Sequence, residues 1–194
     1  MQKKSIKESK INIWSDNTIY FLTDSTYLHY PYFTTDQQKQ IVLNQFKKIK
    51  EKLDIPFSAY SISKNHYHTK FFLKNGTDMV KIKQLLRGGI SHEYKKRYEV
   101  PYKEMWQSKK ILIINSEEVD WKVTGYIIGN LLKHKEVSTF FELKDNPFST
   151  FGYMAGKYGE EEMKDLVYSI IEINEDAFGG VDVKQFDGTR LKPQ

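Results

Sequence analysis

The pattern of hydrophobic and polar positions along the chain predicts a sheet of four strands. Four short segments are rich in β-branched and aromatic residues and have the length of strands: residues 18–23, 57–63, 66–73 and 106–114. Only Lys64 and Asn65 separate the second segment from the third, which predicts a tight hairpin.

Apolar positions at helical spacing fall between these strands. The first helix is expected to start at Thr34, with Gln37 three residues later as in a capping box. The second helix is expected to start around Gly76 and to kink or break at Gly88-Gly89. The order strand-helix-strand-strand-helix-strand predicts an α+β, ferredoxin-like fold, which is an antiparallel sheet with helices on one face.

Two further helices are expected after the last strand. The first is capped by Asn115 together with Glu118 and runs to about Lys135. The second spans about residues 160–173. We therefore expect three regions, which are a basic N-terminal tail (1–10), one domain (11–157) and a C-terminal helix and tail (158–194).

Composition indicates a globular protein. Of the 194 residues, 39% are hydrophobic and 28% are charged, which suits one domain with a proper core. The absence of cysteine excludes disulfides and thiolate metal sites and mildly favours a reducing compartment. The start MQKKSIKESK has no apolar segment typical of a secretory signal, and no apolar run has the length of a membrane span. We expect a cytoplasmic protein with no membrane partner.

Charge and aromatic content give a first indication of partners. The net charge is +5, and the chain contains 13 tyrosines, 12 phenylalanines and 3 tryptophans. Basic groups interleaved with aromatic rings suit a surface that follows phosphates and stacks unpaired bases. Solvated helix faces and an aromatic core would give the same composition, and composition alone favours this simpler interpretation.

The segment NHYHTKFF places His66 and His68 two positions apart on a predicted strand. Alternate side chains of a strand point to the same face, so the two imidazoles would project side by side while Tyr67 points the other way. Two imidazoles held in this way can bind a metal ion, although a polar strand edge would show the same pattern. A third group is needed to distinguish the two interpretations.

The helix that follows the last strand offers such a group. Tyr126, Asn130 and His134 recur every four residues and so line one ridge beside the apolar ridge that faces the sheet. Gly125 and Gly129 occupy interior positions of the same helix, and each costs about 1 kcal/mol relative to alanine. Two such costs predict that either the sheet or a ligand approaches this helix closely.

Together these residues resemble a known family. The strand motif H-Y-H followed by Y-I-I-G-N on a later helix resembles the motifs of the single-tyrosine HUH transposases, named after histidine-hydrophobic-histidine, and most closely those of the REP-associated tyrosine transposases. The stretches KNHYH, QLLRGGIS, MWQSKK and NPFSTFGYMAG are similar to further segments of that family, in the same order. The resemblance covers about residues 18–157.

The resemblance implies a metal-dependent endonuclease and strand transferase that acts on single-stranded DNA by transesterification. Tyr126 would be the nucleophile and would form a 5′-phosphotyrosine intermediate. His66, His68 and Asn130 would hold one divalent ion, which is Mg²⁺ by family expectation, while two imidazoles would also accept Mn²⁺. The phosphodiester is exchanged rather than hydrolysed, so rejoining DNA needs no nucleotide cofactor.

The family resemblance also implies the partner, which is single-stranded DNA with a REP-like or transposon-end hairpin, met at the nucleoid in the cytoplasm. Family members occur as monomers and as homodimers, and both states stay open here. The residues expected to contact DNA are aromatic or basic: Tyr27, Tyr30, Tyr32, Lys95, Lys96, Arg97 and His134.

The chain departs from the family pattern at two positions. Lys64 stands where the family has a proline, and Leu131 stands where a proline usually follows the helix asparagine. Neither residue replaces a reacting group, so the chemistry implied by the family is unaffected. Tyr153 and Tyr158 are the alternative nucleophiles.

Two other classes of protein fit part of the pattern. An RRM-like module has the same order of elements and binds single strands through sheet aromatics, but it has no use for the two histidines. A catalytically inactive or domesticated transposase that only binds hairpins belongs to the same class. A cupin-type metalloenzyme also begins its metal site with two alternate histidines, but it needs a glutamate soon afterwards, and the predicted helices disagree with a barrel.

Overall fold

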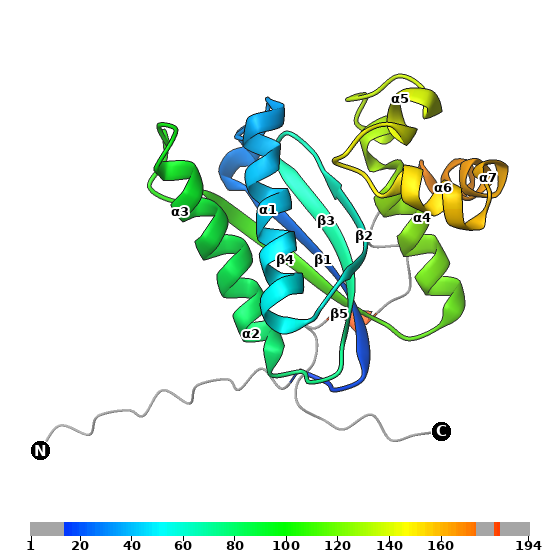
Figure 1. Ribbon diagram of the computed structural model, residues 1–194, viewed down its shortest axis with the longest axis horizontal. Coiled ribbons are helices and arrows are strands. Elements are labelled where there is room, and N and C mark those ends of the chain that lie inside the picture. Colours follow the sequence, from blue (N-terminus) through cyan, green and yellow to red (C-terminus); the bar gives the residue numbers. More distant parts are fainter. Residues whose placement is uncertain (1–13, 174–180, 183–194) are drawn as a thin grey trace, which may run out of the picture.

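The computed structural model describes residues 14–173 and 181–182 (Figure 1). An antiparallel sheet forms its centre, with the strand order β2-β3-β1-β4-β5. The first four strands in this order have the ferredoxin-like arrangement, so the predicted fold class is confirmed. The strands are β1 (Thr18–Thr26), β2 (Phe57–Ile62), β3 (His66–Leu73), β4 (Trp106–Ile114) and β5 (Val181–Asp182).

All four predicted strands are present. Strand β5 was not predicted and pairs with β4 through Leu112 and Ile113. The expected N-terminal tail, 1–10, lies outside the described residues, as do 174–180 and 183–194 of the expected C-terminal region.

The helices between the strands cover one face of the sheet (Figure 1). There Phe46 packs against Phe57 and Tyr67, with ring centroids 4.6 and 5.6 Å apart. The kink predicted at Gly88-Gly89 is a π-helical turn inside an otherwise continuous helix. This face holds α1 (Asp36–Leu53), α2 (Asp78–Lys83), the π-helical turn η2 (Gln84–Gly89) and α3 (Ile90–Lys95).

Two helix starts lie one residue later than predicted. The capping box of α1 uses Thr35 and Gln38, whose side chain also accepts hydrogen bonds from Thr34. The helix α4 (Glu117–Lys133) is capped by Ser116, whose hydroxyl accepts from the Val119 N–H, rather than by Asn115. Adjacent polar residues of similar capping ability make such shifts of one residue hard to predict.

Helix α4 lies on the opposite face of the sheet, together with the remaining helices (Figure 1). Every residue from Val123 to Leu131 is buried, so this part of α4 is enclosed on all sides. None of the helices in the described part of the chain is long and apolar enough to cross a membrane. The helices around α4 are α5 (Phe140–Lys144), α6 (Phe151–Tyr158) and α7 (Glu160–Ile170).

The two interior glycines of α4 face α7. A β-carbon added at Gly129 would lie 2.5 Å from Val167 Cγ1, and one added at Gly125 would lie 2.5 Å from Ile170 Cδ1. The close approach predicted from these glycines is therefore confirmed, but the approaching element is α7 rather than the sheet or a ligand. Because α7 packs on α4, the C-terminal helix is part of the structure that carries the predicted site.

Replacing Gly129 by alanine should loosen this contact. Valine is stiff and close to the backbone, so the clash should lower the free energy of unfolding by about 1–3 kcal/mol despite the better helix propensity of alanine. Gly156 in α6 has nothing within 4 Å of an added β-carbon, so Gly156→Ala should raise stability by about 0.5–1 kcal/mol. Urea unfolding followed by circular dichroism compares the two variants. Equal changes in their free energy of unfolding would contradict the close contact between α4 and α7.

Candidate active site

The alternation of β3 turns His66 and His68 toward α4, while Tyr67 points to the opposite face. The two imidazole centroids are 4.8 Å apart. Both histidines are buried, and their strand is held between β2 and β1, where His68 pairs with Thr23 and His66 with Ser25. The structure therefore brings the two predicted ligands together as expected.

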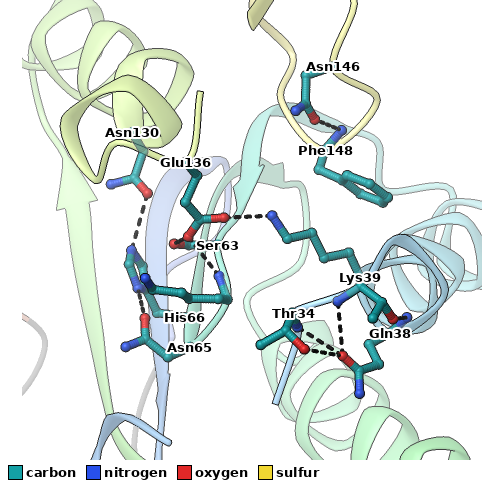
Figure 2. Close-up of polar contacts among 12 residues, drawn as sticks. Thr34, Gln38, Lys39, Ser63, Asn65, His66, Asn130, Glu136, Asn146 and Phe148 are labelled. Atoms are coloured by element: carbon teal, nitrogen blue, oxygen red, sulfur yellow. Dashed lines mark hydrogen bonds and ion pairs between the residues drawn. The ribbon is translucent and has the colours of Figure 1, made fainter. Parts of the chain in front are cut away.

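Both ring nitrogens of His66 make hydrogen bonds to asparagine side chains (Figure 2). Asn65 Nδ2 donates to the His29 carbonyl, so the oxygen Oδ1 of Asn65 faces His66 Nδ1 at 2.7 Å. The other ring nitrogen, Nε2, is hydrogen-bonded to Asn130 Oδ1, 3.1 Å away on α4. An amide oxygen only accepts, so the ring nitrogen that carries the proton of the neutral imidazole donates to the amide oxygen facing it.

His68 is held from the side of β1. Its Nδ1 lies 2.8 Å from the Thr23 hydroxyl, so a metal ion would be bound through the other ring nitrogen. The ring stacks on Phe21 at 5.7 Å and meets the ring of Tyr126 edge-on at 5.2 Å. These contacts leave His68 little freedom to turn.

Burial keeps both histidines neutral at physiological pH. Desolvation, followed by the nearby His134, lowers the pKa of His66 from 6.5 to about 4. Desolvation, followed by the proximity of His66, lowers the pKa of His68 well below its usual value. Neutral imidazoles are the form that binds metal ions, so both side chains are in the protonation state that a metal ligand needs.

Tyr126 lines the same cavity as the histidines. The cavity has a volume of about 290 Å³ and opens between β1, the β2–β3 turn and α4. Lys133 places its ammonium group 4.7 Å from the centroid of the Tyr126 ring. The residues around the cavity are Thr23, Ser25, His29, Ser63, Lys64, Asn65, His66, His68, Tyr126 and His134.

The donor set fits a hard divalent cation. His66 Nε2 and Asn130 Oδ1 lie 3.1 Å apart, close to the roughly 3 Å between adjacent ligands of one octahedral ion. The Asn130 side chain is fully buried, and its Nδ2 has no hydrogen-bond partner among the described residues. Within those residues no group of three His, Cys, Asp or Glu side chains could hold a metal ion, so the site needs the Asn130 oxygen.

Glu136 was not singled out from the sequence, yet it ties the elements of the site together (Figure 2). Its carboxylate accepts hydrogen bonds from the Ser63 hydroxyl and from the Lys64 N–H at 2.9 Å, and it pairs with Lys39 of α1 at 2.6 Å. Its own N–H donates to the carbonyl of Leu131. Glu136 thus joins the end of α4 to the turn that carries His66. A proline in place of Lys64 would lack the N–H that this contact uses.

The expected DNA-contacting residues divide into three groups. His134 lines the cavity, with its ring 4.7 Å from that of His66. Tyr27 is partly exposed and Tyr30 is exposed, and both follow the end of β1. Tyr32, in contrast, is 0% exposed and belongs to the core, because its ring packs against those of Tyr30 and Tyr94. Three exposed basic residues at the end of α3 do not line the cavity: Lys95, Lys96 and Arg97.

The alternative nucleophiles lie elsewhere. Tyr153 and Tyr158 are on α6, and neither lines the cavity with the histidines. Tyr158 instead packs edge-on against Trp121, with ring centroids 5.3 Å apart. Of the three tyrosines considered, only Tyr126 shares a cavity with the two histidines.

Comparison with known proteins identifies the fold through structure alone. No protein-family model matches the chain, and no curated protein matches it. A solved structure of a REP-associated tyrosine transposase bound to a REP hairpin is similar, with a TM-score of 0.62 and 19% identity over 81% of this chain and 87% of that one. A protein from Deinococcus radiodurans R1 proposed to be a transposase aligns at a TM-score of 0.44 and 16% identity, over 65% and 95% of the two chains.

The chain therefore has the fold of a REP-associated tyrosine transposase, the family that its motifs resemble. The alignment with that structure spans most of both chains.

The lowered pKa of His66 predicts a loss of stability in mild acid. Below pH 6.5 the unfolded chain protonates this histidine, whereas the folded chain does not until about pH 4, so the free energy of unfolding should fall as the pH drops. Between pH 7.5 and 5 the loss from His66 should be about 2 kcal/mol, measured by urea unfolding in EDTA. His66→Gln should remove this part of the pH dependence and leave the part due to His68 and His134, whose pKa values are also lowered. An unchanged slope would refute the assignment.

The contacts of Glu136 predict a large effect of its removal. Glu136→Ala leaves the buried ammonium of Lys39 without its partner and should cost about 3 kcal/mol of stability. Adding Lys39→Met should recover part of this loss, which a double-mutant cycle measures. The exposed pair Glu118–Lys122 is the control, and Glu118→Ala should cost under about 0.5 kcal/mol. Equal costs for the two glutamates would contradict a structural role of Glu136.

Proposed function

We propose that this chain is a metal-dependent endonuclease and strand transferase that cleaves and rejoins single-stranded DNA next to a hairpin. One observation carries the proposal: Tyr126, His66 and His68 line a single cavity, and Asn130 meets His66 from the helix of Tyr126. Nucleophile and metal ligand on one helix are what the family chemistry requires.

The reaction is an exchange of phosphate esters. The Tyr126 oxygen attacks the scissile phosphorus, and a new O–P bond forms as the bond from phosphorus to the 3′-oxygen breaks. The proton of the tyrosine is lost to the surroundings, and the leaving oxygen takes up a proton to become a 3′-hydroxyl. The 5′-phosphate stays on the tyrosine until another 3′-hydroxyl attacks it, which restores Tyr126 and joins the strands.

Each residue of the site has a separate role in this scheme. His66, His68 and Asn130 would hold a divalent ion, Mg²⁺ or Mn²⁺, which when bound supplies a Lewis acid for the scissile phosphate. Lys133 places a positive charge 4.7 Å from the ring centroid of Tyr126, where it favours the negative charge that develops on the phenol oxygen. The fixed strand and helix keep these groups in place before substrate binds.

The similar structure with a bound REP hairpin supports a hairpin-bearing substrate for this chain. Positive charge lies beside the cavity at Lys64 and Lys133, where a DNA backbone would have to pass. A chain that had lost its activity would still bind such DNA, so the decisive property is the covalent step.

A covalent-capture assay tests the proposal. Purified protein is mixed with hairpin-bearing single-stranded oligonucleotides of varied flanking sequence, with Mg²⁺ or EDTA, and run on a denaturing gel. We expect a metal-dependent adduct that Tyr126→Phe abolishes and that His68→Ala slows by about 100-fold or more. The matched control Tyr153→Phe changes an exposed tyrosine outside the cavity and should leave the adduct intact. Hairpin binding without any adduct would instead support a DNA-binding module.

A further inference from the structure

The loop after β1 exposes an apolar side chain directly before a residue that lines the cavity. Leu28 lies in the short helical turn η1 (Tyr27–His29) and is 62% exposed. Its neighbour His29 lines the cavity that also contains His66 and Tyr126. A large exposed apolar residue beside a catalytic cavity calls for an explanation, because the core does not need it.

The backbone of this loop is strained. Leu28 has φ 53° and ψ 25°, and His29 has φ 53°, so two consecutive residues other than glycine adopt the left-handed conformation. Each such residue is unfavourable for an L-amino acid, most of all when it is bulky. Strain of this kind persists only where the surroundings enforce it, and it concentrates at functional sites.

Three hydrogen bonds enforce the loop conformation. The Leu28 N–H donates to Gln107 Oε1 at 2.8 Å, the Thr26 hydroxyl donates to the Tyr30 carbonyl at 2.8 Å, and Asn65 Nδ2 donates to the His29 carbonyl at 3.1 Å. The last of these bonds comes from the residue that also orients His66. The position of Leu28 is therefore coupled to that of a predicted metal ligand.

Packing between aromatic rings restrains the loop that carries Leu28. Tyr27 and Tyr30 both pack edge-on against Tyr102, with ring centroids 5.4 and 5.6 Å away. Tyr30 is 38% exposed and follows Leu28 by two residues in the same loop. Lys64, which lines the cavity, is exposed and carries positive charge. An apolar and aromatic surface next to a cationic cavity matches a nucleobase attached to a phosphate.

We propose that Leu28 and Tyr30 form a surface on which an unpaired nucleobase next to the scissile phosphate stacks. This inference rests on the proposed function and deepens it, because it adds a base-contacting site to the cleavage site. The bound base would orient its phosphate toward Tyr126. The surface contacts the face of the base and not its hydrogen-bonding edge, so it selects for an unpaired base rather than for a particular sequence.

The substitution Leu28→Asn tests the contact without disturbing the loop, since asparagine tolerates the left-handed conformation. Wild type and variant are titrated with single-stranded hairpin oligonucleotides that carry 2-aminopurine at successive positions around the cleavage point. We expect stacking on Tyr30 to quench the fluorescence at one position in wild type. Leu28→Asn removes the other half of the surface, so it should weaken this quenching and bind about 5- to 100-fold more weakly. Val80→Asn, at an exposed position of α2, is the matched control and should behave as wild type.

An abasic site at the quenched position provides the second arm. If the base contacts Leu28 and Tyr30, removing the base should weaken wild-type binding by at least the factor that the substitution does. Wild type and Leu28→Asn should then bind the abasic strand equally within about twofold. A variant that still binds the abasic strand more weakly than wild type would show that Leu28 acts in some other way, and would overturn the proposal.

Stability separates a functional from a structural role. Leu28→Gly relieves the left-handed strain and should raise the Tm by about 2–4 °C while binding still weakens. If Leu28 only stabilised the fold, Leu28→Gly would lower both the Tm and the affinity for DNA, and that result would overturn the proposal. If wild type forms the covalent adduct and Leu28→Asn binds and quenches as wild type does, this inference fails and the proposed function stands. If wild type neither binds nor cleaves single strands, both fail.

Discussion

The alternation of side chains along β3 is the constraint on which the candidate site depends. Because β3 lies between β2 and β1, both of its edges are paired, and its side chains cannot slip to the other face without breaking two ladders. His66, His68 and Lys70 therefore all face α4, where they meet Asn130, Tyr126 and Asp120. One strand and one helix running side by side thus generate the whole donor set.

The helix is fixed as firmly as the strand. Gly125 and Gly129 let α7 approach the side of α4 that faces away from the sheet, and Glu136 anchors its end to the β2–β3 turn and to α1. Tyr126 and Asn130 consequently belong to one rigid element held from several directions. Chemistry that needs a nucleophile and a metal ligand at a set separation gains from this arrangement, because neither group has to be ordered when substrate binds.

Features set by local pattern were predictable from the sequence, and those set by distant contacts were not. The strands, the hairpin at Lys64-Asn65 and the ridge of Tyr126 and Asn130 follow from periodicities of two and nearly four residues. Helix caps shifted by one residue because neighbouring polar residues compete. Glu136 could not be foreseen, since its partner Lys39 is 97 residues away along the chain. Tyr32 gave no sign that it lies in the core while its neighbour Tyr30 is exposed.

The enclosure of α4 has a consequence for evolution. From Val123 to Leu131 every residue is buried, so nearly any exchange there disturbs the sheet, α7 or the cavity. A lineage that lost catalysis would still be held to much the same residues by packing alone. Sequence conservation along this helix among related proteins would then not distinguish a catalytically active protein from an inactive one. The informative positions are Tyr126 and Asn130, where phenylalanine or leucine would preserve the packing and remove the proposed nucleophile or metal ligand.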